Sequence, residues 1–170
     1  MENWKDECDK KTIYDLRFII DNKHAYSNEQ LTIAELAIEQ KRTYWKKNNK
    51  DVADQIDMFI RKHLWFDFHV TDYDGYKLSV MGSTDLSYYH MLEIVFENVF
   101  FISGIVTGWH SETNARVFSI PDNEYELNVK YEIEQDYQLF VFKPEDYKND
   151  IIIAAHSLTF DTTIVQYNLK

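Results

Sequence analysis

The spacing of apolar residues changes once along this chain, near Lys62, and this change limits the folds that the chain can adopt. Before it, apolar residues recur at the spacing of a helix that buries one face. After it, apolar residues such as Leu64, Phe66 and Phe68 alternate with polar ones, which is typical of strands. We therefore predict an α+β fold, with a helical segment at residues 1–63 and an antiparallel β domain at residues 64–170.

The helical segment is expected to form a hairpin followed by a short third helix. A first helix is predicted over residues 9–21, and Ser27 with Gln30 has the pattern of a capping box that begins a second helix. Asn48 and Asn49 are expected to end this second helix, so that a third helix covers residues 51–62.

The β domain is expected to be an antiparallel sandwich or barrel. Its alternating runs are separated by short turns, and no long helix is predicted between them. Of the 27 aromatic residues, 20 lie after residue 63, where large rings can fill the space between packed strands. A sheet of about six to nine strands lies within the usual range of sheet sizes.

The net negative charge belongs entirely to the β domain. Residues 1–63 hold 12 basic and 12 acidic residues, whereas residues 64–170 hold six basic and 17 acidic residues. Such a field attracts cations and basic surfaces and repels nucleic acid. No apolar leader or membrane-spanning stretch is evident, and the single Cys8 favours a reducing compartment, so we expect a cytoplasmic protein that binds neither nucleic acid nor membrane.

Four glutamates at alternating positions form the most prominent local pattern. We predict a β-hairpin here whose exposed face carries the carboxylates and whose other face is apolar. One interpretation is a solvated face that discourages edge pairing; the other is a docking surface for a basic partner. The candidate partner-binding residues are Glu124, Glu126, Glu132, Glu134, Asp136 and Tyr131.

A second cluster lies on the first predicted strand, where Trp65, Asp67 and His69 share the face away from the core. A histidine beside a carboxylate and an aromatic wall can form the rim of a small-ligand site, although a surface cluster is the commoner arrangement. The expected turn would place His69 opposite Ser79. No motif for phosphate binding, nucleophilic catalysis or metal binding is present, so no catalytic residue, metal ligand or cofactor is predicted.

Basic residues gather between Lys41 and Lys50 of the helical segment. They fit the C-terminus of a helix, where cations are favoured. Alternatively they could bind phosphate, or dock on the acidic β domain of the same chain or of a second copy, which would make a homo-oligomer.

Two stretches resemble proteins of bacteria. Residues 12–27, TIYDLRFIIDNKHAYS, followed by Glu35-Leu36 and Lys41-Arg42, are similar to a helical hairpin at the ends of many uncharacterised bacterial proteins. Residues 82–99, GSTDLSYYHMLEIVFENV, resemble small bacterial β-rich proteins, some of which are grouped with immunity proteins of toxin systems. The resemblance implies a bacterial, cytoplasmic, non-enzymatic protein and supplies no site residues.

These observations favour a non-enzymatic acidic binding protein, of which an immunity-type inhibitor that covers a basic protein partner is one form. Two alternatives remain open. One is a small-ligand-binding protein or metal-dependent enzyme with its site in the mouth of the β domain, and the other is a structural homo-oligomer.

Overall fold

The structure is a computed structural model that describes residues 2–167, and these residues form two compact units that divide between Asn48 and Asn49. The division falls inside one long helix, α3 (Asn28–Ile60), and not where helix gives way to strand. The first unit contains the N-terminal part of α3, and the second contains its last residues and all the strands. The predicted α+β class, with helices before an antiparallel sheet, is confirmed.

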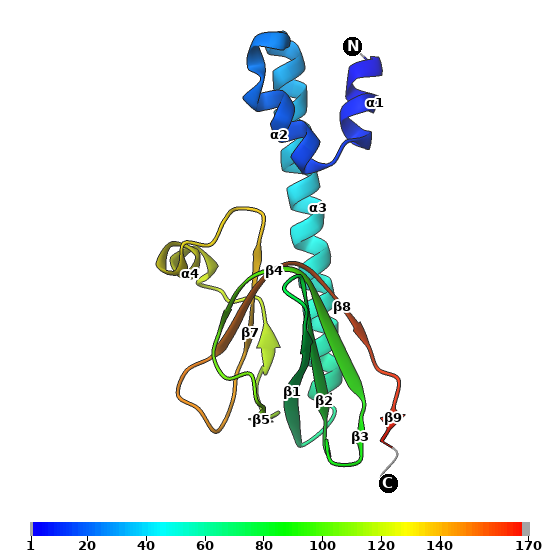
Figure 1. Cartoon of the computed structure of the whole chain (residues 1–170), viewed down its shortest axis with the longest axis vertical. Helices are drawn as coiled ribbons and strands as arrows, with labels where there is room; N and C mark the ends of the chain where they lie inside the picture. Colours follow the sequence, from blue (N-terminus) through cyan, green and yellow to red (C-terminus); the bar gives the residue numbers. More distant parts are fainter. Residues whose placement is uncertain (1, 168–170) are drawn as a thin grey trace. The chain divides into compact units, whose positions relative to one another are not determined.

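The first unit is helical. Before α3 it contains α1 (Glu2–Lys10), α2 (Ile13–Asp21) and the 3₁₀ turn η1 (Lys23–Ala25), as Figure 1 shows. Its small core consists of Cys8, Leu16, Ile19, Ala34, Ala37 and Ile38. The predicted capping box is confirmed: the backbone N–H of Gln30 donates to Oγ of Ser27 at 3.2 Å, and that of Ser27 donates to Oε1 of Gln30 at 2.9 Å.

The predicted break at Asn48 and Asn49 is wrong, because α3 continues to Ile60. Asparagine costs a helix only about 0.7 kcal/mol relative to alanine, so packing easily outweighs it. Asn49 is buried, and its Nδ2 donates to the carbonyl oxygen of His156 at 3.0 Å. Ala53, Ile56 and Ile60 follow on the same helix and are buried in the core of the second unit. The expected third helix is therefore the end of α3.

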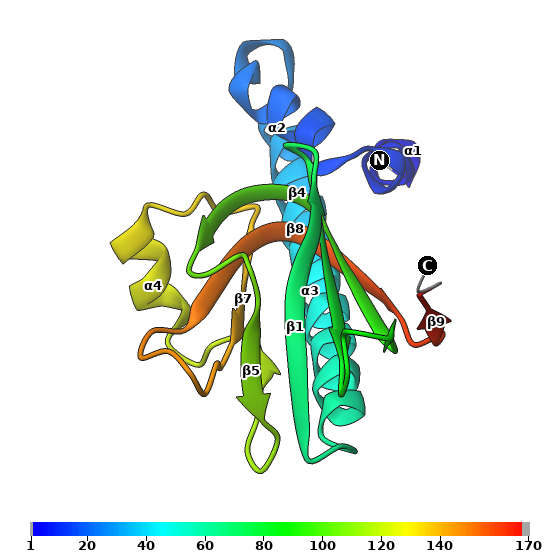
Figure 2. The same cartoon turned by 60° about the horizontal axis from the view of Figure 1, so that its bottom comes forward.

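The second unit is built on a curled antiparallel sheet (Figures 1 and 2). Among the described residues, the main sheet has seven strands in the order β5-β1-β2-β4-β8-β7-β6, and β3 and β9 pair separately. The strands are β1 (Trp65–Tyr73), β2 (Lys77–Ser83), β3 (Tyr89–His90), β4 (Leu92–Ser103), β5 (Trp109–Glu112), β6 (Phe118–Ser119), β7 (Gln138–Phe142), β8 (Ile151–Asp161) and β9 (Val165–Gln166).

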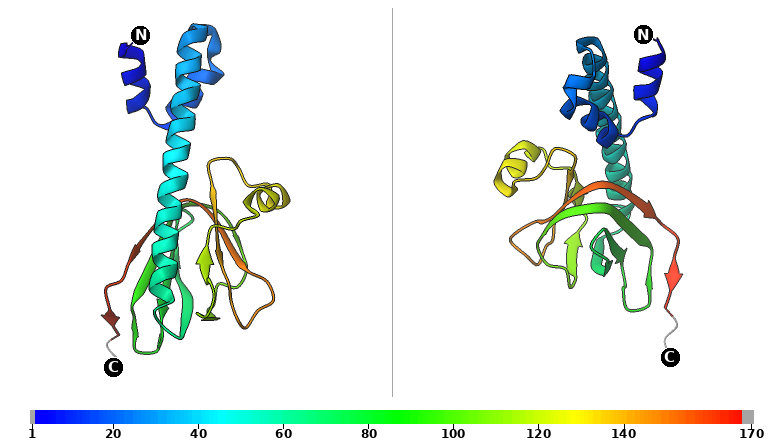
Figure 3. Two further views of the ribbon diagram at one scale, coloured as in Figure 1. Left: turned by 180° about the vertical axis from the view of Figure 1, so that it is seen from behind. Right: turned by 45° about the horizontal axis from the view of Figure 1, so that its top comes forward.

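The main core lies between the concave face of this sheet and residues 49–60 of α3, which Figure 3 shows from two sides. From the helix side it receives Ala53, Ile56 and Ile60, and from the sheet it receives many aromatic rings. Phe68 stacks on Trp109 with ring centroids 5.3 Å apart, and Phe142 meets Trp109 edge-on at 5.0 Å. Such ring pairs contribute to stability beyond the area that they bury.

A buried carboxylate fastens the edge of the sheet to α3. Asp57 is 2% exposed, and its Oδ1 accepts the backbone N–H groups of Val117 at 2.8 Å and Phe118 at 3.0 Å. Its Oδ2 lies 3.8 Å from Nε of Arg116 and 3.9 Å from Nη1 of Arg61. The carboxylate therefore has both hydrogen-bond donors and positive charge around it, as a buried ion requires.

The predicted hairpin that carries the four glutamates is wrong in its first strand, because residues Glu124–Tyr131 form the helix α4. Leu139, Val141, Ile152 and Ala154 lie on the outer faces of β7 and β8, directed towards this segment. An apolar segment must cover these side chains to keep them from water. On a helix Leu127 and Tyr131 lie on one face and pack there. Leu127 and Tyr131 share a face in a helix and also in a strand, so the sequence pattern alone could not distinguish a helix from a strand here.

The register of the first hairpin also differs from the prediction. Val70 pairs with Val80, Phe68 pairs with Gly82, and the ladder shifts between Val70 and Asp72. A β-carbon at position 82 would lie 2.5 Å from Cε1 of Phe66, so the glycine makes room for the buried rings of β1. His69 therefore lies opposite Met81 instead of Ser79.

Replacing Asp57 tests its role as an anchor. Asp57→Ala leaves two buried backbone N–H groups without an acceptor, which should lower the free energy of unfolding by about 2–4 kcal/mol. Asp57→Asn keeps an acceptor oxygen and should cost about half as much. Urea denaturation followed by circular dichroism measures both. The exposed Asp51→Ala on the same helix is the control, with a change within about 0.5 kcal/mol. Equal loss in all three variants would contradict the anchor.

Candidate functional site

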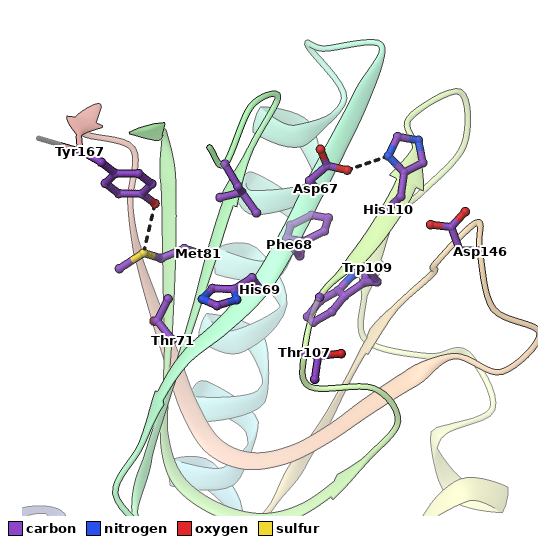
Figure 4. A pocket seen from close by; sticks show the side chains of 12 residues that line it. Asp67, Phe68, His69, Thr71, Met81, Thr107, Trp109, His110, Asp146 and Tyr167 are labelled. Carbon is purple, nitrogen blue, oxygen red and sulfur yellow. Dashed lines mark hydrogen bonds and ion pairs between the residues drawn. The ribbon is translucent and has the colours of Figure 1, made fainter. Parts of the chain in front are cut away.

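A cavity of about 640 Å³ opens on the second unit where β1 and β5 diverge. Figure 4 shows that its walls come from β1, β2, β5, the loop after β7 and the residue that follows β9. The lining residues are Asp67, Phe68, His69, Thr71, Met81, Leu86, Thr107, Gly108, Trp109, His110, Asp146 and Tyr167. Its volume lies within the range of small-molecule sites.

The pairing of β1 with β5 brings the central side chains together. Phe68 pairs with Trp109 on the core side, so Asp67 and His110 are neighbours on the opposite face. Gly108 precedes this ladder with φ +143°, and a β-carbon there would lie 3.1 Å from the carbonyl oxygen of Phe68. A glycine therefore permits β5 to approach β1 closely at the edge of the cavity.

Asp67 and His110 form a hydrogen-bonded pair, with Oδ1 and Nδ1 2.7 Å apart. An ionised carboxylate only accepts, so Nδ1–H of the imidazole is the donor and Nε2 is the atom that titrates. The hydrogen bond with Asp67 raises the pKa of His110, and partial burial opposes this. The negative charges of Asp146 and Glu112 raise the pKa further. Oε1 of Glu112 lies 3.9 Å from Nε2.

Backbone contacts place the loop after β7 beside this pair. The N–H of Glu145 donates to the carbonyl of His110 at 2.8 Å, and Oγ of Ser111 donates to the carbonyl of Lys143 at 2.8 Å. These bonds connect the edge strand β5 with the loop that carries Asp146. Asp146 consequently lines the cavity close to His110, as seen in Figure 4.

The opposite wall is held by Tyr167. Its hydroxyl lies 3.1 Å from Nδ1 of His90 and 3.7 Å from Sδ of Met81, and burial raises the pKa of this phenol. Its backbone N–H donates to the carbonyl of Tyr88 at 2.8 Å. The short pair of strands β3 and β9 thus fixes the aromatic ring beside the cavity.

Two of the three predicted rim residues, Asp67 and His69, line this cavity, whereas Trp65 does not. The indole of Trp65 donates to the carbonyl of Thr84 at 3.3 Å instead. Sequence reasoning missed Trp109, His110, Asp146 and Tyr167 because they are distant from β1 in the chain. Within residues 2–167, no group of three His, Cys, Asp or Glu residues is placed to hold a metal ion.

The six predicted partner-binding residues do not form one strand face. Glu124 points to β7, where its Oε1 accepts from the side chain of Gln138 and from the backbone N–H of Leu139 at 3.4 Å. Tyr131 is half-buried against Phe101, with ring centroids 4.9 Å apart. These two residues hold α4 on the sheet.

The rest of the segment faces solvent. Glu126, Glu132 and Glu134 are exposed, Asp136 is half-buried, and Glu132 ends α4 in the left-handed conformation at φ 54°. Tyr125 is 77% exposed and Val129 is 63% exposed, although both were predicted to be on the apolar side of a strand. The outward surface of α4 is therefore apolar and acidic at once.

The His110–Asp67 pair predicts a dependence of stability on pH. Because folding raises the pKa of His110, the pair contributes fully to the free energy of unfolding below the unfolded-state pKa of about 6.5. This contribution is lost as pH rises through the folded-state pKa. Asp67→Asn should lower the pKa of His110 and flatten this part of the profile. NMR titration of the imidazole and urea midpoints between pH 5 and 9 measure both effects. An unchanged pKa in Asp67→Asn would contradict the pairing, and Asp72→Asn on the same strand is the control.

Among the described residues, none of the helices combines the length and the apolar character needed to cross a bilayer. Comparison of the chain with protein-family models, with curated proteins and with solved structures gives no match.

Proposed function

We propose that the protein is a non-enzymatic acidic binding protein that binds a basic protein partner through the outward face of α4, defined as Tyr125, Glu126, Val129 and Glu132. The observation that carries this proposal is the exposure of Tyr125 and Val129, 77% and 63%, four residues apart on one helix. Side chains at this spacing share a face of the helix, so Tyr125 and Val129 form one continuous apolar strip.

The strip has the composition of a binding surface. Tyrosine is enriched among the residues that dominate interface energies, because its ring gives a large contact area and its hydroxyl a hydrogen bond. Glu126 and Glu132 adjoin the apolar pair and are exposed, which gives a charged rim around an apolar centre.

The charge of the second unit favours a basic partner. Residues 49–170 hold nine basic and 20 acidic residues. Several of the basic groups already face carboxylates: Lys77 lies 2.9 Å from Glu97, and Arg116 lies 3.2 Å from Asp54. The acidic excess thus draws a cationic surface towards this unit and speeds its capture.

This mode of binding suits an inhibitor of the immunity type, which acts by covering a basic surface of a toxin. The resemblance of residues 82–99 to β-rich proteins of that kind agrees with it. A homo-oligomer through the same surface would bring Glu126 and Glu132 of two copies together, and like charges oppose such an interface.

The proposal is tested by placing a photo-crosslinking amino acid at Tyr125 and identifying the cross-linked protein in native cells. We expect a protein of basic sequence. With that protein purified, Tyr125→Ala with Val129→Ala should weaken binding about tenfold or more, because the apolar centre is lost. Glu126→Lys with Glu132→Lys should slow association at low salt, and the difference should vanish at high salt.

Asp51→Lys with Asp72→Lys is the matched control, because it makes the same change in net charge at exposed positions elsewhere on the second unit. We expect it to alter affinity by less than about threefold. Equal effects of both charge reversals would show that α4 is not the interface. Cross-linking to a second copy alone, with a dimeric mass in light scattering, would favour the homo-oligomer and overturn the proposal.

A further inference from the structure

We propose that the basic partner anchors itself by inserting one large apolar side chain into a second cavity of the second unit, beside the N-terminus of α4. This inference rests on the proposed function, because it names the group of the partner that occupies a site next to the outward face of α4. The cavity has a volume of about 500 Å³ and is bounded by β6, β7, the start of β8 and the residues that lead into α4.

The floor of this cavity is a row of side chains across three strands. Ser119 of β6 pairs with Val141 of β7, and Val141 pairs with Ile152 of β8, so the three side chains share the outer face of the sheet. The helix α4 packs on this face through Leu127, which also lines the cavity (Figure 2). The cavity is therefore a gap at the edge of the contact between α4 and the sheet.

The walls of the cavity are apolar and remain partly open. Ile120, Pro121 and Leu127 line it and are half-buried, so part of each side chain is in contact with water. The floor is nearly closed, since Val141 is 2% exposed and Ile152 is 6% exposed. The walls thus supply the surface that an apolar group would remove from water on entering, and this removal favours binding.

The charged groups at the rim favour an apolar side chain that has basic neighbours. Nζ of Lys143 is paired with Oδ2 of Asp150, and Nη2 of Arg116 lies 3.2 Å from Oδ1 of Asp54. These pairs leave Asp122 as the remaining charged residue of the rim, and it is exposed. A negative charge at the mouth opposes a partner segment with acidic neighbours and attracts one with basic neighbours.

The mouth of the cavity adjoins the outward face of α4. Asn123 lines the cavity and directly precedes α4, and Tyr125 is only two residues further on. A helix rises about 1.5 Å per residue, so Tyr125 lies within one turn of the mouth. A protein interface of ordinary size spans both features. An apolar side chain held in a pocket is the kind of contact that dominates the energy of such interfaces.

Two small probes test the cavity in the absence of the partner. N-acetyl-L-phenylalaninamide presents an aromatic side chain between two amide groups, as a protein segment does, and N-acetylglycinamide lacks the side chain. The readout is the methyl resonances of Ile120 and Leu127 in ¹H–¹³C NMR spectra. We expect saturable shifts with the phenylalanine derivative, and binding about fivefold or more weakly with the glycine derivative, because only the first removes the apolar walls from water.

Ser119→Phe fills the cavity from its floor and should abolish the shifts caused by N-acetyl-L-phenylalaninamide. Ser79→Phe is the matched control, because Ser79 is also half-buried on the outer face of a strand but lies outside the cavity. Urea denaturation shows whether both variants remain folded. Pro121→Ala removes part of one wall without adding volume, and it should weaken the probe about threefold.

With the partner identified, Ser119→Phe should weaken its binding about tenfold or more, whereas Ser79→Phe should not. Methyl resonances that do not move, or that move equally with both probes, would overturn the inference. Unchanged affinity for the partner in Ser119→Phe would also overturn it. If Tyr125→Ala with Val129→Ala still weakens binding in that case, the proposed function stands and only the anchor in the cavity is wrong.

Discussion

The packing of one helix segment inside a curled sheet is the constraint on which the rest of the second unit depends. Residues 49–60 of α3 supply Ala53, Ile56 and Ile60 to the core, and the strands wrap around them. A sheet that curls this far has open edges, and Asp57 fastens one of them by accepting the N–H groups of Val117 and Phe118. The helix therefore fills the core and also holds the edge strand β6 in place.

Both candidate surfaces follow from the way in which this sheet ends. β7 and residues 151–155 of β8 are buried on both faces, since α3 covers one face and α4 the other. At the opposite edge β5 has only four residues, and Gly108 directly precedes it beside β1. Beyond that point β1 continues without a partner on this side, and the space next to it becomes the cavity. A longer β5 would have paired with His69 and Thr71 and closed it.

The sequence predicts most of what depends on local pattern. The capping box of Ser27 and Gln30 and the alternation of Phe66 and Phe68 are properties of neighbouring residues. It does not predict what depends on distant packing. The continuation of α3 through Asn49 needs the carbonyl of His156, and the pair of Asp67 and His110 joins residues that are 43 positions apart. No local signal indicates either contact.

The wrong prediction for residues 124–131 explains why α4 has its surface. As a strand, this segment would have placed Tyr125, Leu127, Val129 and Tyr131 on a single apolar face. As a helix it can direct only Leu127 and Tyr131 towards the sheet, so Tyr125 and Val129 are left in water. Leu127 and Tyr131 are sufficient to cover β7 and β8. Polar residues at positions 125 and 129 would therefore serve the fold equally well. The apolar character of these two positions is therefore not explained by the fold, which is the reason for placing the proposed binding surface there.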